Sequence, residues 1–248
     1  MLSEERKALI LEYINANHAV TTTQLIERFN ASEATIRRDL SEMSSRGMIT
    51  KVHGGAVSNQ TTIANDYNVS EREGKNIDEK RAIARYAASL IHTNDMIYID
   101  AGTTTSLLID YVDATNVTFV TNAIMHAQKL SAKGYKVFLT GGRLKSMTEA
   151  LVGGDCYEAI IKYRFSLGFF GTNAVNHEDG FTTPDPDEAK IKEIALKRSL
   201  SPYILCDHEK FDLSAPVSFG SYDSACIITA GKIPASYAKD NSIIRVNS

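Results

Sequence analysis

The spacing of the apolar positions changes near residue 76 of the chain. Before residue 58, apolar residues recur three and four positions apart, which predicts short amphipathic helices that bury one face. From residue 76 onward, short and uniformly apolar runs alternate with helix-length stretches, a pattern typical of strands joined by helices. The polar residues between the two parts show no apolar period. We therefore expect a domain over 1–57, a linker over 58–75 and a second domain over 76–248.

The first domain is predicted to contain three short helices and a β-hairpin. The first helix begins near Ser3. Its inward positions are expected to be Leu9, Ile10, Tyr13 and Ile14. Thr21 and Gln24 have the spacing of a capping box and mark the start of the second helix. The alternating apolar residues within 47–56, together with a glycine pair, predict a hairpin that forms a wing.

The third helix carries the most informative pattern in the chain. Ser32 is a suitable N-cap, and Ile36, Leu40 and Met43 recur at helical spacing and define one buried stripe. The remaining residues near the helix start then face outward, as they do in a recognition helix that enters the major groove of DNA. A winged helix-turn-helix that reads double-stranded DNA is therefore predicted. The candidate DNA contacts are Thr21, Ser32, Glu33, Ala34, Thr35, Arg37, Arg38, Lys51 and His53.

The bland alternative is a small helical bundle in which Glu33 and Arg37 form an i,i+4 ion pair on a solvated face. Charge alone does not decide between the two, since the formal net charge is −3 and the pI is about 6.1. Within residues 1–58 the Lys and Arg residues equal the Asp and Glu residues in number, so their formal charges cancel. Binding to an operator would then depend on where the cations lie and on pairing two half-sites, so a homodimer or homotetramer is expected.

No apolar run approaches the length of a membrane span, and the N-terminus lacks the apolar core of a signal peptide. A cytoplasmic protein without a membrane partner is therefore expected. Cys156, Cys206 and Cys226 lie far apart and lack the spacing of zinc ligands. We expect reduced cysteines, no metal site and no cofactor.

The second domain is predicted to be an α/β open parallel sheet, Rossmann-like in the broad sense. Its apolar runs are buried on both faces, and the helix-length spacers imply parallel crossovers. The expected strands are 96–100, 117–121, 136–140, 166–171, 202–207, 225–230 and 242–246. The expected helices include 77–91, 104–112, 123–132 and 187–199.

Polar residues follow five of these strands, at the edge where ligands of open α/β sheets bind. The turn Gly102–Thr105 is the most specific of these signals for a ligand, because its hydroxyl and N–H groups can surround a phosphate. The turn lacks the lysine of an ATP-binding loop, which disfavours ATP. A small phosphorylated metabolite is therefore favoured as the ligand. The candidate effector contacts are Asp100, Gly102, Thr103, Thr104, Thr105, Thr121, Asn122, Gly141, Gly142, Arg143, Gly171, Asn173, Glu188, Lys192, Asp207 and Lys210.

Each of these signals has a structural alternative. Thr103 or Thr104 can simply cap a helix, and paired glycines usually mark a turn. Glu188 and Lys192 lie one helical turn apart, so spacing alone is equally consistent with a surface ion pair and with contacts to sugar hydroxyls or phosphate.

Taken together, these motifs resemble the DeoR family of bacterial transcriptional repressors nearly from end to end. The matching stretches are 35–40 (TIRRDL), 53–56 (HGGA), Asp100 to Thr104, Thr121-Asn122, Gly141-Gly142 and 207–211 (DHEKF). The stretches 147–153, 164–166, 173–176 and 187–189 are similar to the subgroup of lactose phosphotransferase-system repressors of Gram-positive bacteria.

The resemblance implies a repressor of a lactose/tagatose or fructose operon whose 76–248 domain senses a sugar phosphate. That domain would be similar to ribose-5-phosphate isomerase and would bind a ketose phosphate such as tagatose 6-phosphate or fructose 1-phosphate. The alternative is a sugar-phosphate isomerase-like enzyme with a DNA-binding appendage. The chain departs from the isomerases in one loop, which in them holds a pair of catalytic aspartates and here reads Gly171-Thr172-Asn173-Ala174. Because no carboxylate pair is present there, binding without turnover is expected.

Overall fold

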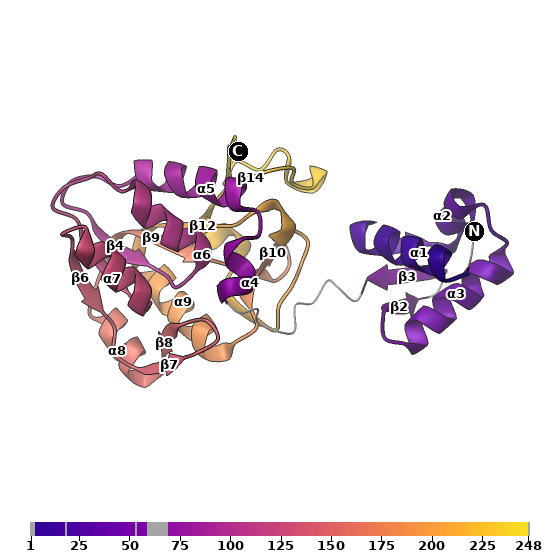
Figure 1. The fold of residues 1–248 in the computed structure, drawn as a ribbon, viewed down its shortest axis with the longest axis horizontal. Coiled ribbons are helices and arrows are strands. Elements are labelled where there is room, and N and C mark those ends of the chain that lie inside the picture. Colours follow the sequence, from indigo (N-terminus) through magenta and orange to yellow (C-terminus); the bar gives the residue numbers. More distant parts are fainter. Residues whose placement is uncertain (1–2, 18, 53, 59–68, 248) are drawn as a thin grey trace. The chain divides into compact units, whose positions relative to one another are not determined.

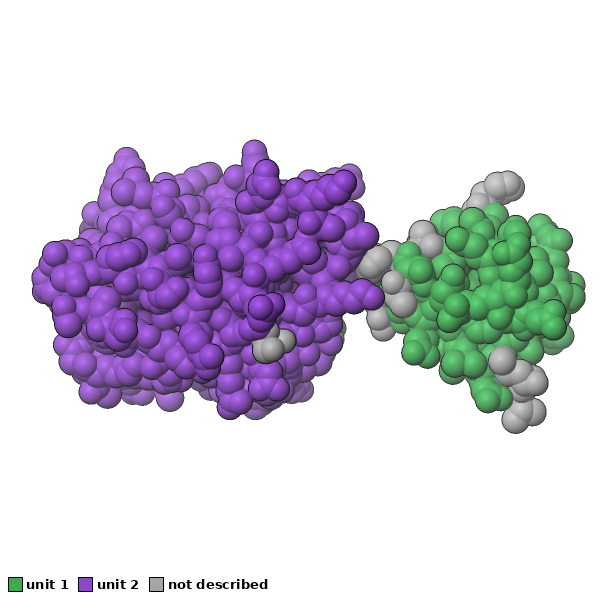
Figure 2. Space-filling model, turned by 90° about the horizontal axis from the view of Figure 1, so that it is seen from above, with its two compact units in different colours: residues 1–62 green, residues 63–248 purple. Residues whose placement is uncertain are grey.

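The computed structural model describes residues 3–17, 19–52, 54–58 and 69–247 (Figure 1). The chain forms two compact units, Met1–Thr62 and Ile63–Ser248 (Figure 2). The expected linker 58–75 overlaps the second unit, and residues 59–68 of it lie outside the described residues.

The first unit has three helices and a small antiparallel sheet, as predicted. Its elements are α1 (Ser3–Asn17), β1 (Ala19–Thr21), α2 (Thr22–Phe29), α3 (Glu33–Ser45), β2 (Ile49–Val52) and β3 (Gly55–Ser58). β2 and β3 form the predicted hairpin, and β1 pairs with the other side of β3. The wing is therefore anchored to the segment that leads into α2.

Local hydrogen bonds fix where α2 and α3 begin. Thr21 and Gln24 form the predicted capping box, in which each side chain bonds the backbone N–H of the other residue. The Ser32 hydroxyl accepts a bond from the Thr35 N–H at 3.3 Å and caps α3. These caps satisfy backbone donors that would otherwise have no partner in the first helical turn.

The core of the first unit contains the predicted stripe of α3, namely Ile36, Leu40 and Met43. Ile10 and Ile14 of α1 are fully buried against it. The expectation that Leu9 lies inward was wrong, because its side chain is 39% exposed. A unit this small covers only a narrow face of α1, and Leu9 lies beside that face.

The second unit is built on a parallel sheet with the order β15-β14-β12-β9-β4-β5-β6. All seven strands predicted from the sequence belong to it. They are β4 (Met96–Ile99), β5 (Thr118–Thr121), β6 (Lys136–Leu139), β9 (Phe165–Gly171), β12 (Ser199–Leu205), β14 (Cys226–Ala230) and β15 (Ile243–Val246).

Helices cover both faces of this sheet, as Figure 1 shows. α5 (Ile77–Ser89), α6 (Thr103–Leu108) and α7 (Ile124–Ala132) share one apolar cluster with alternate strand residues. α8 (Gly154–Ile161) and α9 (Pro186–Arg198) share a second cluster with the intervening strand residues. The inner strands β14, β12, β9, β4 and β5 therefore contribute buried residues to both clusters, which explains their uniformly apolar sequences, whereas the edge strand β6 is only partly covered.

Several short elements were not predicted from the sequence. They are β1, α8, the hairpin of β7 (Arg143–Lys145) and β8 (Ala150–Val152), the strands β10 (Ala174–Asn176), β11 (Gly180–Thr183) and β13 (Val217–Gly220), and the 3₁₀ turns His208–Lys210, Tyr222–Ser224 and Ala235–Tyr237. The short helix α4 (Val69–Glu73) lies near the end of the stretch 58–75 that was expected to be a linker, and the 3₁₀ turn Ile109–Tyr111 ends the predicted helix 104–112. Most of these short elements are too short to show a hydrophobic period, so their pairing is decided by contacts that are distant in sequence.

Candidate functional site

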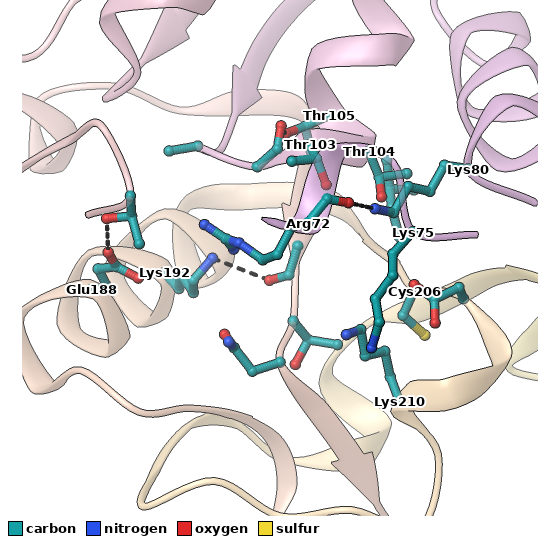
Figure 3. Close-up of a pocket in the computed structure, with 18 residues that line it drawn as sticks. Arg72, Lys75, Lys80, Thr103, Thr104, Thr105, Glu188, Lys192, Cys206 and Lys210 are labelled. Carbon is teal, nitrogen blue, oxygen red and sulfur yellow. Dashed lines mark hydrogen bonds between the residues drawn. The ribbon is translucent and has the colours of Figure 1, made fainter. Parts of the chain in front are cut away.

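A pocket lies at the edge of the sheet where the parallel strands β12, β9 and β4 end. It encloses about 720 Å³ of empty space, open solvent at its mouth included. The turn between β4 and α6 and the loop after β9 supply part of its lining. α9, the segment after β12, and the residues around α4 supply the rest (Figure 3).

The threonines of the turn after β4 have different roles. Thr105 is fully buried, and its hydroxyl donates to the carbonyl oxygens of Asp100 at 2.7 Å and Gly102 at 2.9 Å, so it closes the turn. The hydroxyls of Thr103 and Thr104 have no hydrogen-bond partner among the described residues, and both line the pocket. Figure 3 shows them on the same side of the pocket as Lys80.

Cations dominate the pocket lining. Five cationic side chains contribute to it, namely Arg72, Lys75, Lys80, Lys192 and Lys210, whereas its carboxylates are Glu188 and Asp207. Figure 3 shows the ammonium groups of Lys75 and Lys210 pointing toward the same region, while Arg72 extends into the pocket from α4. An excess of positive charge in a partly enclosed space favours an anionic ligand.

Lys80 is the most unusual of these cations, because its side chain is only 4% exposed. Its ammonium group donates to the carbonyl oxygen of Arg72 and forms no ion pair with a described residue. Burial lowers the pKa of Lys80, and the like charges of Lys210, Arg72 and Lys75 lower it further, against the opposing effect of Asp207. A bound anion would relieve this repulsion.

Lys192, by contrast, is already neutralised. Its ammonium group pairs with the buried carboxylate of Asp100 and donates to the carbonyl oxygen of Gly171 at 3.1 Å. The same Asp100 carboxylate accepts a bond from the Gly171 N–H at 3.2 Å. This network ties α9 to the ends of β4 and β9 and holds the pocket floor.

Glu188 is held by two donors at another part of the pocket. Its Oε1 atom accepts from Thr148 and from the Lys145 ammonium group at 3.0 Å. The Asp185 carboxylate caps α9 by accepting from the Glu188 N–H at 2.9 Å. The helix cap is thus present, but the surface ion pair of the structural alternative is not: Glu188 pairs with Lys145, Lys192 pairs with Asp100, and both residues are buried and line the pocket.

The structure brings ten of the sixteen candidate effector residues to the pocket lining. These are Gly102, Thr103, Thr104, Thr105, Gly171, Asn173, Glu188, Lys192, Asp207 and Lys210. Asp100 lies beneath them and acts through Lys192 and Gly171.

The other five candidates do not line this pocket, and each has a structural role. The Thr121 hydroxyl accepts from the Ala123 N–H, and Asn122 bonds Ala101, Tyr98 and Leu151. Gly141 and Gly142 precede the β7–β8 hairpin, where a Cβ on Gly142 would lie 2.5 Å from the Val152 carbonyl oxygen. Arg143 is largely exposed and pairs with Asp187 at 3.1 Å.

Sequence reasoning missed several residues of the pocket lining, namely Arg72, Lys75, Lys80, Thr148, Thr172 and Cys206. The first three precede or open α5, where a polar stretch was interpreted as a linker and a helix start. Only the packing of α4 and α5 against the strand ends reveals them. Burial raises the pKa of the Cys206 thiol, so it offers no thiolate.

The candidate DNA contacts lie mostly on the surface of the first unit. Ser32, Glu33, Ala34, Arg37 and Arg38 of the α3 region are exposed, as are Thr21 and Lys51, and Thr35 is partly buried. His53 lies outside the described residues.

The charged contacts of this surface are local. Arg37 pairs with Glu33 at 2.6 Å, whereas Arg38 has no ion pair with a described residue. Lys51 of the wing donates to the Ser41 hydroxyl at 2.7 Å, which brings the wing and α3 onto one surface.

Other kinds of site find no support in the described part of the chain. It holds no group of three or more His, Cys, Asp or Glu side chains arranged to bind a metal ion. None of its helices is long and apolar enough to cross a membrane. All three cysteines are free thiols.

A winged helix-turn-helix unit followed by an α/β unit with a ligand pocket defines the class of DNA-binding transcriptional regulators with a sensor domain. The chain belongs to the DeoR family. Residues 6–62 match the model of the DeoR-like helix-turn-helix domain, and residues 75–231 match that of the DeoR C terminal sensor domain.

Named regulators are similar to this chain over most of its length. It is 44% identical to the HTH-type transcriptional regulator FruR of Bacillus subtilis (strain 168), over 92% of this chain and 91% of the relative. It is 38% identical to the lactose phosphotransferase system repressor of Staphylococcus aureus (strain N315), over 85% of this chain and 84% of that relative. The chain is accordingly a transcriptional regulator and not an enzyme.

Among solved structures, a ribose 5-phosphate isomerase A from Methanocaldococcus jannaschii is 14% identical, with a TM-score of 0.40 over 55% of each chain. The sorbitol operon regulator SorC from Klebsiella pneumoniae is 12% identical, with a TM-score of 0.40 over 83% of this chain and 90% of the other. At these TM-scores neither likeness carries an argument.

Proposed function

We propose that this regulator represses a carbohydrate-utilisation operon and that a phosphorylated sugar bound in the pocket controls its affinity for operator DNA. The observation that carries the proposal is the buried ammonium group of Lys80, which has no carboxylate in ion-pair distance among the described residues. A dianionic phosphate is the small-molecule group that best satisfies such a cluster of cations.

The two ends of the pocket suit the two parts of a sugar phosphate. The phosphate would lie near Lys80 and Lys210, where the hydroxyls of Thr103 and Thr104 can donate to its oxygens. The sugar hydroxyls would lie toward Glu188, whose carboxylate can accept hydrogen bonds. We propose a ketose phosphate as the ligand, either tagatose 6-phosphate or fructose 1-phosphate; a lactose phosphotransferase system repressor among the relatives is consistent with regulation by a sugar.

DNA is proposed to contact the exposed start of α3 and the wing. Arg37 and Arg38 supply the charge, while Ser32, Ala34 and Thr35 allow the helix to approach the groove closely. Because residues 1–58 carry no formal net charge, a single unit would bind weakly, so we propose a cytoplasmic homodimer or homotetramer that pairs two half-sites.

An isomerase-like enzyme with a DNA-binding appendage is not favoured. Proton abstraction beside a carbonyl needs a base and a polarising partner. The loop 171–174 contains no carboxylate, and Glu188 is already engaged by Lys145 and Thr148.

The test is fluorescence anisotropy of the full chain on DNA from upstream of its own operon, at fixed salt. Tagatose 6-phosphate or fructose 1-phosphate should change operator affinity by roughly 5- to 150-fold, the usual range of allosteric coupling. Free tagatose and fructose are the controls and should have no effect. Tight operator binding that neither sugar phosphate alters would overturn the proposal.

A further inference from the structure

The short helix α4 lies where the pocket meets the chain segment that leads to the DNA-binding unit. It is the first element described in the second unit, and residues 59–68, which lie outside the described residues, connect it to β3. None of its residues is buried. Its position therefore depends on few contacts, two of which belong to the pocket.

The first link between α4 and the pocket is the Arg72 side chain, which extends into the pocket (Figure 3). Its Nε atom is inaccessible to solvent and has no hydrogen-bond partner among the described residues. A buried guanidinium N–H without an acceptor is unfavourable. Here it faces a pocket that several other cations line, so an anionic acceptor would satisfy it.

The second link is the Arg72 backbone, whose carbonyl oxygen accepts from the buried ammonium group of Lys80. Lys80 therefore anchors the backbone of α4, and the Arg72 guanidinium extends from the same residue toward Lys192 (Figure 3). An anion that binds Lys80 acts directly on this anchor.

A hollow beside α4 leaves room for the helix to shift. Val69 and Glu73 of α4 line it together with Ile77 of α5, Leu107 of α6 and Met125 of α7. It encloses about 1320 Å³, open solvent included. Since close-packed elements resist displacement, α4 is the part of the pocket wall that can change position with the least disruption of packing.

We propose that Arg72 is a ligand of the effector's phosphate group and that this contact couples the pocket to the chain leading to the DNA-binding unit. The proposal rests on the proposed function. A planar guanidinium matches two phosphate oxygens, so the bound anion favours the docked position of α4. A ligand shifts an equilibrium only by binding one state more tightly, and Arg72 supplies that difference because it moves with α4.

The experiment compares the full-length wild type with Arg72→Met, Arg72→Lys and the control Arg81→Met. Arg81 is half-exposed on α5, pairs with Asp78 and does not line the pocket. Calorimetry measures binding of tagatose 6-phosphate and fructose 1-phosphate. Hydrogen exchange measures protection of residues 69–73, and anisotropy measures operator affinity with and without the sugar phosphate.

In the wild type and Arg81→Met, the sugar phosphate should protect residues 69–73 and change operator affinity. Arg72→Met should bind the sugar phosphate roughly tenfold more weakly, as expected for one lost charge-assisted contact. Saturating sugar phosphate should then change neither the protection of residues 69–73 nor the operator affinity of this variant. Arg72→Lys, which keeps the charge without the planar fork, should retain part of both responses.

A saturated Arg72→Met variant that changes operator affinity by the wild-type factor would overturn the coupling but leave the proposed function intact. The coupling would also be overturned, with the proposed function intact, if the sugar phosphate changed the operator affinity of the wild type without protecting residues 69–73 from hydrogen exchange. If neither sugar phosphate binds the wild type, the proposed function fails and the coupling fails with it.

Discussion

Two buried lysines of the pocket have opposite environments. Lys192 lies against the buried carboxylate of Asp100, so its charge is neutralised within the protein. Lys80 is buried to a similar extent but meets a backbone carbonyl and other cations. A neutralised buried lysine serves the fold, whereas one without a carboxylate is available to an anion.

Substitution of the two lysines should therefore give different results. Lys80→Met should weaken sugar-phosphate binding at least about tenfold with little loss of stability, because it removes a repelled charge. Lys192→Met should lower the free energy of unfolding by on the order of 3–5 kcal/mol, because Asp100 is left buried and unpaired. Calorimetry and urea unfolding measure the two effects. Equal losses of stability in both variants would contradict this assignment.

His126 should make stability depend on pH. Burial, with a smaller contribution from Lys129, lowers the pKa of His126 to about 4. Below about pH 6.5 the unfolded chain takes up a proton that the folded chain does not, so stability should fall as the pH drops toward 4. The loss between pH 7 and pH 5 should be about 2 kcal/mol.

Urea unfolding at the two pH values measures this effect, and His126→Gln is the matched variant because it removes the titrating group. The variant should be less stable at pH 7 but should lose less stability on acidification. An equal loss in the wild type and the variant would show that another group is responsible.

At the scale of elements, α3 has two polar faces with different partners. Asp39 points inward and accepts from the Arg6 guanidinium at 2.7 Å, so it joins α3 to α1. Arg37 and Arg38 point outward. Asp39 thus serves the fold, whereas Arg37 and Arg38 of the same helix serve the proposed DNA contact.

Arg37→Ala and Arg38→Ala should each weaken operator binding and reduce the salt dependence of the affinity by about one unit of slope. Their binding of sugar phosphate should remain at the wild-type level, since that pocket is lined by residues of the second unit alone. Anisotropy over a range of salt concentrations measures the slope. An unchanged slope in both variants would place the DNA contacts elsewhere.

At the scale of the whole molecule, the proposed homodimer or homotetramer requires a surface for a second copy. β6 is an edge strand of the sheet, and its apolar side chains Phe138 and Leu139 are 38% and 44% exposed. Leu144 of β7, which follows β6 in the chain, is half-exposed as well. An exposed apolar edge strand favours pairing with another strand.

Phe138→Lys should therefore shift the protein toward the monomer in sedimentation velocity and weaken operator binding. Leu200→Lys is the control, because Leu200 is the most exposed of the large apolar residues described and lies on β12 rather than on β6. Wild-type assembly of the Phe138→Lys variant would exclude this edge as the interface.

The sequence alone determined the elements whose signals are local. Periodicity set the helices of the first unit and the seven strands of the sheet, and side-chain spacing set the caps at Thr21 and Ser32. It also identified the edge of the sheet where the pocket lies, because parallel strands place their carboxyl ends together.

Only the tertiary structure decided which of those polar residues face the pocket. Asn122 and Gly142 follow strands as Asp207 does, yet their hydrogen bonds and backbone conformation serve the fold. The sequence around Lys80 and Arg72 gives no local indication that they line a pocket. A helix start and a polar stretch look the same in the sequence whether or not they pack against the strand ends. Burial and charge repulsion are properties of neighbours distant in the chain, and folding alone brings those neighbours together.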